Sequence, residues 1–367
     1  MAASESPVRP DYGLGGIEAL MPALLRRTRP AWLPEPVVDA AGLVLLVLDG
    51  LGTAIVEANR ARLSELAAMA GAAITTVVPS TTASALTSLT TGLAPGEHGI
   101  VGYRQRADGE VLNTLRWQTD SGRRPPDPFS VQRHTPFLGR PVPVVTRSGF
   151  RRTGFTDAHL RGAPFYGWST VAVLVEHCRR LAAQREPLVY AYYPGVDTVA
   201  HEFGLEHECF HAELAFADEL VSRMLDALSP DVALVVTADH GHVQVGGGWL
   251  GLEPLGDLVR GCCGEGRFRW LDAPRGGVPA LAEAARDVFG AVAWVMTRDE
   301  VFDEGWLGSV APSGSVRRRV GDVVLAARDG VAFVDPALPR EAMLVGAHGS
   351  LTHAEMLVPL LAARGRG

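Results

Sequence analysis

The sequence predicts an α/β fold: a mostly parallel sheet with helices on both faces, and a smaller α+β insertion. Three continuous apolar runs carry this prediction: Gly42–Leu48, Leu188–Tyr193 and Val232–Thr237. Unbroken apolar runs of this length are typical of parallel strands that are buried on both faces. Helical patterns lie between these runs along the chain, as expected when helices cover a parallel sheet.

The chain has 367 residues, of which 47% are hydrophobic, enough for one large α/β domain or two ordinary ones. We expect residues 1–41 to form a proline-rich N-terminal extension. Residues 42–242 and 344–367 are expected to form the core, with a loop insertion at 104–167 where the pattern is irregular. Residues 243–343 show short strand patterns around one helix and are expected to form a smaller α+β cap.

The remaining elements follow from local periodicity. The expected helices are Ile17–Arg27, Glu57–Ala70, Thr170–Ala183, His207–Leu228 and, in the cap, Val278–Phe289. The further expected strands are Ala72–Val78 and, in the cap, Arg267–Leu271, Ala291–Val295, Asp322–Ala326 and Val331–Val334, and a last apolar segment spans Met356–Leu361.

Composition narrows the range of partners. The formal net charge of -7 argues against a nucleic-acid polymer as the main partner. No apolar run approaches the length of a membrane span, and the first residues lack the order of a secretory signal. The 4 cysteines show neither a disulfide framework nor zinc-ligand spacing. We therefore expect a soluble, cytoplasmic protein without a membrane partner. Every basic residue is arginine, which indicates a GC-rich, bacterial genome.

The segment Pro79–Tyr103 places hydroxyl groups at a strand-to-helix turn. Ser80, Thr81 and Thr82 follow an apolar run, and a pattern of small and apolar residues then continues to Gly92. A hydroxyl at such a turn is exposed beside helix N-terminal amides that can hold an anion, which suits a nucleophile. The alternative interpretation is a threonine that only caps the helix.

Metal-ligating residue types follow four apolar runs. A lone Asp after a strand is usually a cap, but four such positions are hard to explain by packing, because buried carboxylates without partners are costly. Carboxylate and imidazole groups together suit zinc and other divalent ions. The candidate ligands are Asp49, Asp197 with His201, Asp239 with His240, and His348.

The residues of these motifs and their order along the chain resemble those of the alkaline phosphatase superfamily, and most closely those of its nucleotide pyrophosphatase/phosphodiesterase branch. The resemblance spans roughly residues 42–105, 188–205, 232–242 and 344–361. The motifs that carry it are Asp49, Pro79-Ser80-Thr81-Thr82, Thr91-Gly92-Leu93-Ala94-Pro95-Gly96-Glu97-His98-Gly99, Asp197 with His201, Asp239-His240-Gly241 and Gly346-Ala347-His348-Gly349.

The resemblance implies two divalent metal ions, expected to be Zn²⁺ with Mn²⁺ as the alternative. It assigns one ion to Asp197, His201 and His348, and the other to Asp49, Asp239 and His240 together with the Thr82 oxygen. It also implies that Thr82, rather than Thr81, is the catalytic nucleophile and forms a phosphoryl- or nucleotidyl-threonine that water hydrolyses. The implied substrate is a small-molecule phosphate diester or nucleotide, while the oligomeric state stays open.

Some positions depart from the family pattern. The family has an asparagine shortly after the His-Gly pair to bind a phosphoryl oxygen, whereas Tyr103 stands here. We expect Tyr103 and Asn113 to be substrate-binding residues, with Asn113 supplying the amide from elsewhere in the insertion. His98 is interpreted as structural, and His242 and His353 as residues outside the ligand set.

Other functions remain open on the sequence alone. A phosphomonoesterase of the superfamily would need an Arg near the nucleophile, and Ala83, Ser84 and Ala85 follow Thr82 instead. A sulfatase would need a Cys or Ser nucleophile in a C/S-x-P-x-R motif, which is absent. A phosphonoacetate-type hydrolase would share the threonine and the metal set, and a group from the insertions would identify it. A catalytically dead binding protein is disfavoured because the ligands and the nucleophile are all present.

Overall fold

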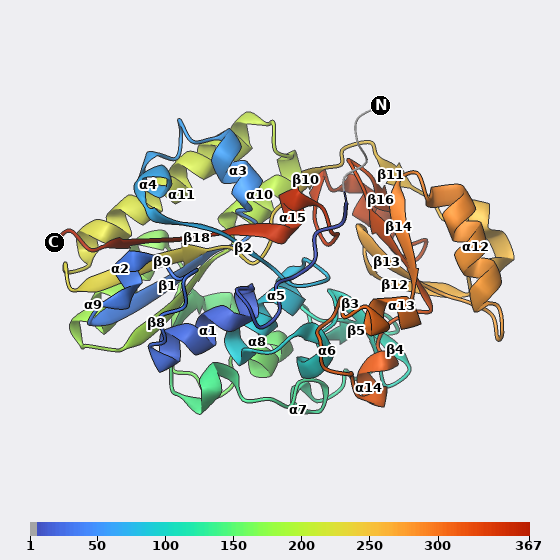
Figure 1. Ribbon diagram of the computed structural model, residues 1–367, viewed down its shortest axis with the longest axis horizontal. Coiled ribbons are helices and arrows are strands. Elements are labelled where there is room, and N and C mark those ends of the chain that lie inside the picture. The colour runs from blue at the N-terminus through green and yellow to red at the C-terminus, as the bar shows by residue number, and fades with distance from the viewer. Residues whose placement is uncertain (1–5) are drawn as a thin grey trace.

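The computed structural model describes residues 6–367, and a 7-stranded sheet forms its centre (Figure 1). Across this sheet the strand order is β2 (Ala70–Thr75), β18 (Leu357–Arg364), β9 (Val232–Thr237), β1 (Gly42–Leu48), β8 (Leu188–Tyr193), β6 (Val144–Arg147) and β7 (Phe165–Trp168). Strand β18 runs antiparallel to both of its neighbours, whereas the pairs from β9 to β7 are all parallel. The predicted mostly parallel sheet is therefore confirmed.

The three apolar runs form the middle of this sheet. All residues of β1, β8 and β9 are buried, as expected for strands covered on both faces. Their register pairs Leu48 with Tyr193 and Val47 with Thr237. The polar residues that follow these strands consequently emerge at one edge of the sheet, which is where parallel sheets place their sites.

Helices cover both faces of the sheet (Figure 1). On one side lie α3 (Thr53–Ala58), α4 (Ser64–Ala68), α10 (Gly195–Phe203) and α11 (Glu208–Ala227), and α9 (Val171–Ala183) packs against α11. On the other side lie α1 (Ile17–Arg26), α5 (Thr82–Thr91) and α8 (Gly154–His159), and α1 packs directly on α5. The short helices α2 (Glu35–Val38), α6 (Pro95–His98), α7 (Pro128–Val131) and α15 (His353–Met356) complete this part of the chain.

A second sheet stands at the other end of the molecule (Figure 1). It is 4-stranded and antiparallel, in the order β12 (Gly261–Glu265), β13 (Phe268–Asp272), β15 (Val323–Ala327) and β14 (Ala293–Thr297). Helix α12 (Val278–Phe289) packs on it, α13 (Arg298–Asp303) contacts β14, and α14 (Gly314–Arg317) belongs to the same stretch of the chain. This is the predicted smaller α+β insertion, while the domain bounds expected from the sequence stay a prediction.

Three small sheets link these parts. The first joins β3 (Arg104–Ala107), β4 (Glu110–Asn113) and β5 (Gln118–Thr119). The other two pair β10 (Val243–Gln244) with β17 (Gly346–Ala347), and β11 (Trp249–Leu250) with β16 (Ala332–Phe333). In residues 6–367 no helix is long and apolar enough to cross a membrane.

Some predicted elements were wrong in detail. The single helix expected at Glu57–Ala70 is wrong. Helix α3 ends at Ala58, where the side-chain amide of its C-cap residue Asn59 donates to the Ile55 carbonyl, and the separate helix α4 begins at Ser64. The strand expected at Ala72–Val78 ends at Thr75, since Thr75 pairs with Leu357, the first residue of β18.

The stretch 104–167, expected to be an irregular loop insertion, contains the small sheet β3–β5 and two strands of the central sheet, β6 and β7. Their 4-residue length gives too few positions for a clear alternation in the sequence.

Candidate active site

Thr82 is the first residue of α5, at the carboxyl edge of the sheet. The N-cap position of this helix falls on Thr81, whose side chain makes no capping hydrogen bond. Thr82 is therefore not the cap residue that the alternative interpretation required. Its side chain is 7% exposed, and its Oγ1 lies 3.1 Å from Nε2 of His240. The hydroxyl thus stands at a helix N-terminus, beside one of the candidate ligands.

One cluster of possible ligands consists of Asp49, Asp239 and His240, whose ligand atoms all lie within 4.8 Å of one another. Nε2 of His240 is 3.4 Å from Oδ1 of Asp49 and 3.5 Å from Oδ2 of Asp239. Each carboxylate also accepts a hydrogen bond from a residue outside the cluster. The Tyr192 hydroxyl donates to Asp49, and the Gly50 amide donates to Asp239 at 3.1 Å.

Within residues 6–367 the two carboxylates of this cluster lack a full set of hydrogen-bond partners. Asp49 Oδ1 and Asp239 Oδ2 are buried and accept no hydrogen bond in the described chain. Burial, followed by the neighbouring carboxylates of Asp239 and Asp197, raises the pKa of Asp49 well above its usual range. Two buried carboxylates that face each other are costly unless a cation lies between them. The arrangement therefore fits a divalent ion.

The second cluster contains Asp197, His201, His242 and His348, again with all ligand atoms within 4.8 Å of one another. Nε2 of His201 lies 3.2 Å and Nε2 of His348 3.7 Å from Oδ1 of Asp197. Asp197 and His201 lie on the same helix, α10, four residues apart, so that both side chains reach one face.

Backbone carbonyls orient the two predicted histidines of this cluster. Nδ1 of His201 lies 2.7 Å from the Gly346 carbonyl, and Nδ1 of His348 lies 2.9 Å from the Ser80 carbonyl. Each Nδ1–H donates to its carbonyl, which leaves the Nε2 lone pair directed toward the cluster, as metal-ligating histidines require. Burial and the neighbouring histidine His240 lower the pKa of His348, so its imidazole is neutral.

His242 was interpreted from the sequence as lying outside the ligand set, and the structure places it inside the cluster. Its Nε2 is 2.9 Å from Oδ1 of Asp197, and its side chain is buried. The approach depends on Gly50, since a Cβ there would lie 2.8 Å from the His242 ring. The only sequence signal was its position two residues after His240, which by itself does not distinguish a ligand from a packed histidine.

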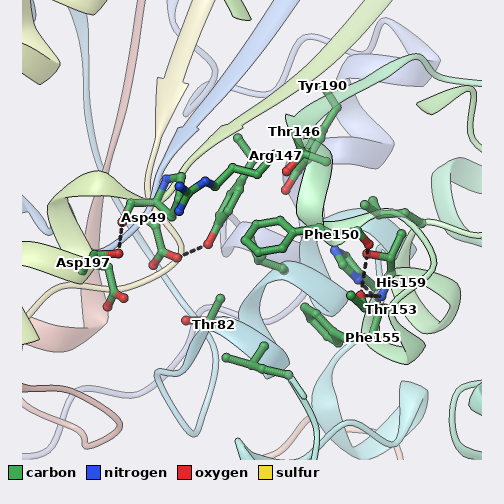
Figure 2. Close-up of a pocket in the computed structure, with 17 residues that line it drawn as sticks. Asp49, Thr82, Thr146, Arg147, Phe150, Thr153, Phe155, His159, Tyr190 and Asp197 are labelled. Atoms are coloured by element: carbon green, nitrogen blue, oxygen red, sulfur yellow. Dashed lines mark hydrogen bonds between the residues drawn. The ribbon is translucent and has the colours of Figure 1, made fainter. Parts of the chain in front are cut away.

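Two cavities meet at this edge. The first, of about 240 Å³, is lined by Asp49, Thr82 and Asp197 on one side and by Phe150 and Phe155 on the other (Figure 2). The second, of about 310 Å³, shares Thr82 and Asp197. Its other lining residues come largely from the small sheets and the insertion: Thr81, Tyr103, Leu115, His201, Trp249, Glu265, Gly266, Leu338, Glu341, Leu344, Ala347 and His348.

The two expected substrate-binding residues have different positions. Tyr103 lines the second cavity, whereas Asn113 is not among the residues that line either of the two cavities. The Asn113 side chain donates to the Tyr103 hydroxyl at 2.6 Å and accepts from the Arg116 amide at 3.0 Å. Asn113 therefore contacts the Tyr103 hydroxyl and does not itself line either of these two cavities. His98, interpreted as structural, is buried and bonds Ser88 and the Ile100 amide.

This fold, with paired Asp/His clusters and a threonine at a helix N-terminus, defines the class of alkaline phosphatase superfamily enzymes. The family described as type I phosphodiesterase / nucleotide pyrophosphatase matches residues 43–351. The chain belongs to this family and is a hydrolase that acts on phosphoric ester bonds. No curated protein gave a significant match.

Solved structures share the fold. Murine ectonucleotide pyrophosphatase / phosphodiesterase 5 is 16% identical, with a TM-score of 0.68 over 88% of this chain and 87% of that one. The human protein of the same name is also 16% identical, with a TM-score of 0.65 and the same coverage of 88% and 87%. Phosphonoacetate hydrolase from Sinorhizobium meliloti 1021, in complex with phosphonoformate, is 18% identical, with a TM-score of 0.63 over 89% of this chain and 91% of that one.

Proposed function

We propose that this protein is a phosphodiesterase that depends on two divalent metal ions and uses Thr82 as its nucleophile. The observation that carries the proposal is the position of Thr82, which lines both cavities together with Asp197. A phosphorus atom beside the Thr82 hydroxyl therefore has room for one substituent in each cavity. A diester has two such substituents and would fill both cavities, whereas a monoester has one and would leave the other cavity empty.

The chain's own residues would bind and orient the substrate. The phosphoryl group would lie at the N-terminus of α5, where backbone amides attract an anion. The Thr82 oxygen would form a bond to phosphorus, and the bond from phosphorus to one alcohol oxygen would break. Water would then cleave the resulting phosphothreonine ester, so that the products are a monoester and an alcohol.

We propose that Asp197, His201 and His348 hold one ion, and that Asp49, Asp239 and His240 hold the other together with Thr82. Two ions bound there would stabilise charge on the attacking and leaving oxygens of an in-line displacement. The mixed carboxylate and imidazole donors suit Zn²⁺, with Mn²⁺ as the alternative. Cavities of about 240 and 310 Å³ suit a small molecule rather than a polymer. The cytoplasmic location stays a prediction.

Two solved structures bear on the substrate. An inactive threonine-to-alanine variant of the murine protein is in complex with AMP, which supports a threonine nucleophile and a nucleotide or related diester here. The bacterial phosphonoacetate hydrolase has been solved with phosphonoacetate, a substrate with a second acidic group. In this chain Arg147 lines the first cavity and could bind such a group, so phosphonoacetate hydrolysis is the second candidate activity.

A substrate panel tests the proposal. Purified protein, loaded with Zn²⁺ or Mn²⁺, is assayed on bis-p-nitrophenyl phosphate, p-nitrophenyl phosphate and phosphonoacetate under identical conditions. We expect the highest kcat/KM for the diester. A higher value for p-nitrophenyl phosphate would indicate a phosphomonoesterase, and a higher value for phosphonoacetate would indicate the second candidate activity.

A further inference from the structure

A buried ion pair joins the antiparallel 4-stranded sheet of the insertion to the segment that follows His348. Arg267 immediately precedes β13 of that sheet, and Glu355 lies on α15. Both side chains are fully buried. Nε and Nη2 of Arg267 donate to the two carboxylate oxygens of Glu355 at 2.7 and 2.9 Å. The contact is therefore bidentate, a geometry that holds a carboxylate in one orientation.

Glu355 in turn holds the loop that carries His348. Its Oε1 accepts from the Ser350 amide at 2.9 Å, and its Oε2 accepts from the Thr352 hydroxyl at 2.6 Å. Ser350 is two residues from His348, and its hydroxyl donates to the carbonyl of Ala327, the last residue of β15, at 2.6 Å. The loop is thus fixed by the ion pair and also directly by the sheet of the insertion.

The backbone of α15 contacts the other metal cluster. The Glu355 carbonyl accepts from the Gly241 amide at 3.0 Å, and Gly241 directly follows His240 in the chain. The two segments are so close that a Cβ on Gly241 would lie 1.9 Å from the Ala354 carbonyl oxygen. A displacement of α15 would therefore disturb the residue beside His240 as well as the loop with His348.

Backbone carbonyls of the insertion bind the guanidinium group of Arg267 on its other side. Its Nη1 donates to the carbonyl of Asp329 at 2.8 Å and to that of Val331. Neither Arg267 nor Glu355 leaves a buried side-chain nitrogen or oxygen without a partner in residues 6–367. A buried ion pair offsets the cost of its desolvation only when further hydrogen bonds satisfy both groups in this way. The pair is therefore a well-ordered link between the insertion and the core.

Arg269, on β13 itself, provides a comparison within the same strand. It is also fully buried, and it donates to Glu341 and to the carbonyls of Phe333 and Gly264. None of these three residues adjoins a candidate metal ligand in the chain. The two arginines thus share burial and location, but Arg267 is the one whose partner holds the ligand loops.

We propose that Arg267 is a positioning residue for the metal ions. Through Glu355 it holds the loop with His348 and the residue beside His240, so that metal binding and the packing of the insertion on the core stabilise each other. The coupling is reciprocal, because an interaction that favours the metal-binding arrangement is itself strengthened when metal binds. This inference rests on the proposed metal centre and extends it to a residue of the insertion.

The Zn²⁺ affinity of three variants, measured by competition with a chromogenic chelator, tests the inference. Arg267→Met should bind Zn²⁺ about 10–100-fold more weakly than the wild-type protein. Arg267→Lys should lie between the two, since it keeps the charge but loses the bidentate contact. The matched control Arg269→Met also loses a buried arginine and should lose stability, yet it should bind Zn²⁺ as the wild type does. Wild-type affinity in Arg267→Met, or equal losses of affinity in the two methionine variants, would overturn the inference.

Hydrogen exchange in the wild-type protein decides the question if Arg267→Met does not fold. Addition of Zn²⁺ should slow amide exchange in the ligand loops and also in residues 323–331, which contain no candidate ligand but include the carbonyls that bind Arg267 and Ser350. Protection confined to the ligand loops would overturn the inference while the metal centre stands. If Zn²⁺ neither binds nor slows exchange in any segment, the proposed metal centre fails, and this inference fails with it.

Discussion

Oγ1 of Thr82 and Nε2 of His240 lie 3.1 Å apart, although 158 residues separate them in the chain. Thr82 begins a helix and His240 follows the buried strand β9, so the contact joins a helix N-terminus to the carboxyl edge of the sheet. A candidate nucleophile and a candidate metal ligand are thereby adjacent, which is the arrangement that metal activation of a hydroxyl requires.

The first prediction separates Thr82 from its neighbour. Thr82→Ala should lower the rate on bis-p-nitrophenyl phosphate roughly a thousandfold or more, as loss of a nucleophile does in other hydrolases. Thr82→Ser should retain part of the activity, because the attacking oxygen remains. Thr81→Ala should cost less than about 1 kcal/mol of stability, the usual contribution of a capping side chain, because Thr81 makes no capping hydrogen bond. Initial rates and thermal unfolding measure these effects.

Metal content provides the control for this prediction. Thr82→Ala should still bind two ions per chain by elemental analysis, because the carboxylates and imidazoles remain. An inactive Thr81→Ala beside a nearly normal Thr82→Ala would place the nucleophile one residue earlier. Full activity in both variants would instead leave a metal-bound water as the attacking group.

The second prediction concerns His242, which contacts Asp197 at 2.9 Å. His242→Met removes this contact and replaces the imidazole by an apolar side chain of similar size. We expect the affinity for one of the two metal ions to fall about 10–100-fold, because groups that contact a ligand fix its orientation. Competition with a chromogenic chelator measures the affinity. The matched variant His177→Gln, on α9, should bind both ions normally. Unchanged affinity in His242→Met would restore the interpretation of His242 as a packed residue.

The third prediction concerns metal removal. Dialysis against a chelator should lower the melting temperature of the protein, because Asp49 and Asp239 then face each other in a buried site without a cation. Addition of Zn²⁺ should restore the melting temperature and the activity together. Asp49→Asn should reduce the difference between the metal-free and metal-loaded melting temperatures, since it removes one of the repelling charges. An identical melting temperature with and without metal would contradict the metal assignment.

The fourth prediction concerns acid stability and His159. This residue stacks on Phe155 with ring centroids 4.0 Å apart, and its Nδ1–H donates to the Phe155 carbonyl at 2.7 Å. Burial lowers its pKa from 6.5 to about 4. Between these values the unfolded chain binds a proton that the folded protein does not, so stability falls as the pH decreases from about 6.5 to 4.

The contribution of His159 to this loss should be about 3 kcal/mol at most. Urea unfolding at pH 7 and pH 4.5 measures it in the wild-type protein and in His159→Gln. The variant is expected to lose less stability over this interval than the wild type, whatever its stability at pH 7. Equal losses in the two proteins would show that His159 is already charged in the folded state.

Much of this architecture is determined by local sequence. The runs Gly42–Leu48 and Val232–Thr237 are so continuously apolar that they can only be buried on both faces, and both are strands with the predicted bounds. The carboxyl ends of parallel strands share one edge, so Asp49 and Asp239 had to come close once these strands paired. The sequence by itself therefore determined the buried middle strands of the sheet and the candidate ligand residues that follow them.

Other features were decided only by the tertiary structure. The sequence did not reveal that His242 enters the cluster beside Asp197, that Asn113 stands behind Tyr103, or that Glu265 faces a cavity shared with Thr82. The Tyr103 amide and Glu265 are 162 residues apart, and their contact depends on how the insertion packs against the core. Periodicity reports which face of one element is buried, but the convergence of side chains from separate elements depends on long-range packing, which no local pattern encodes.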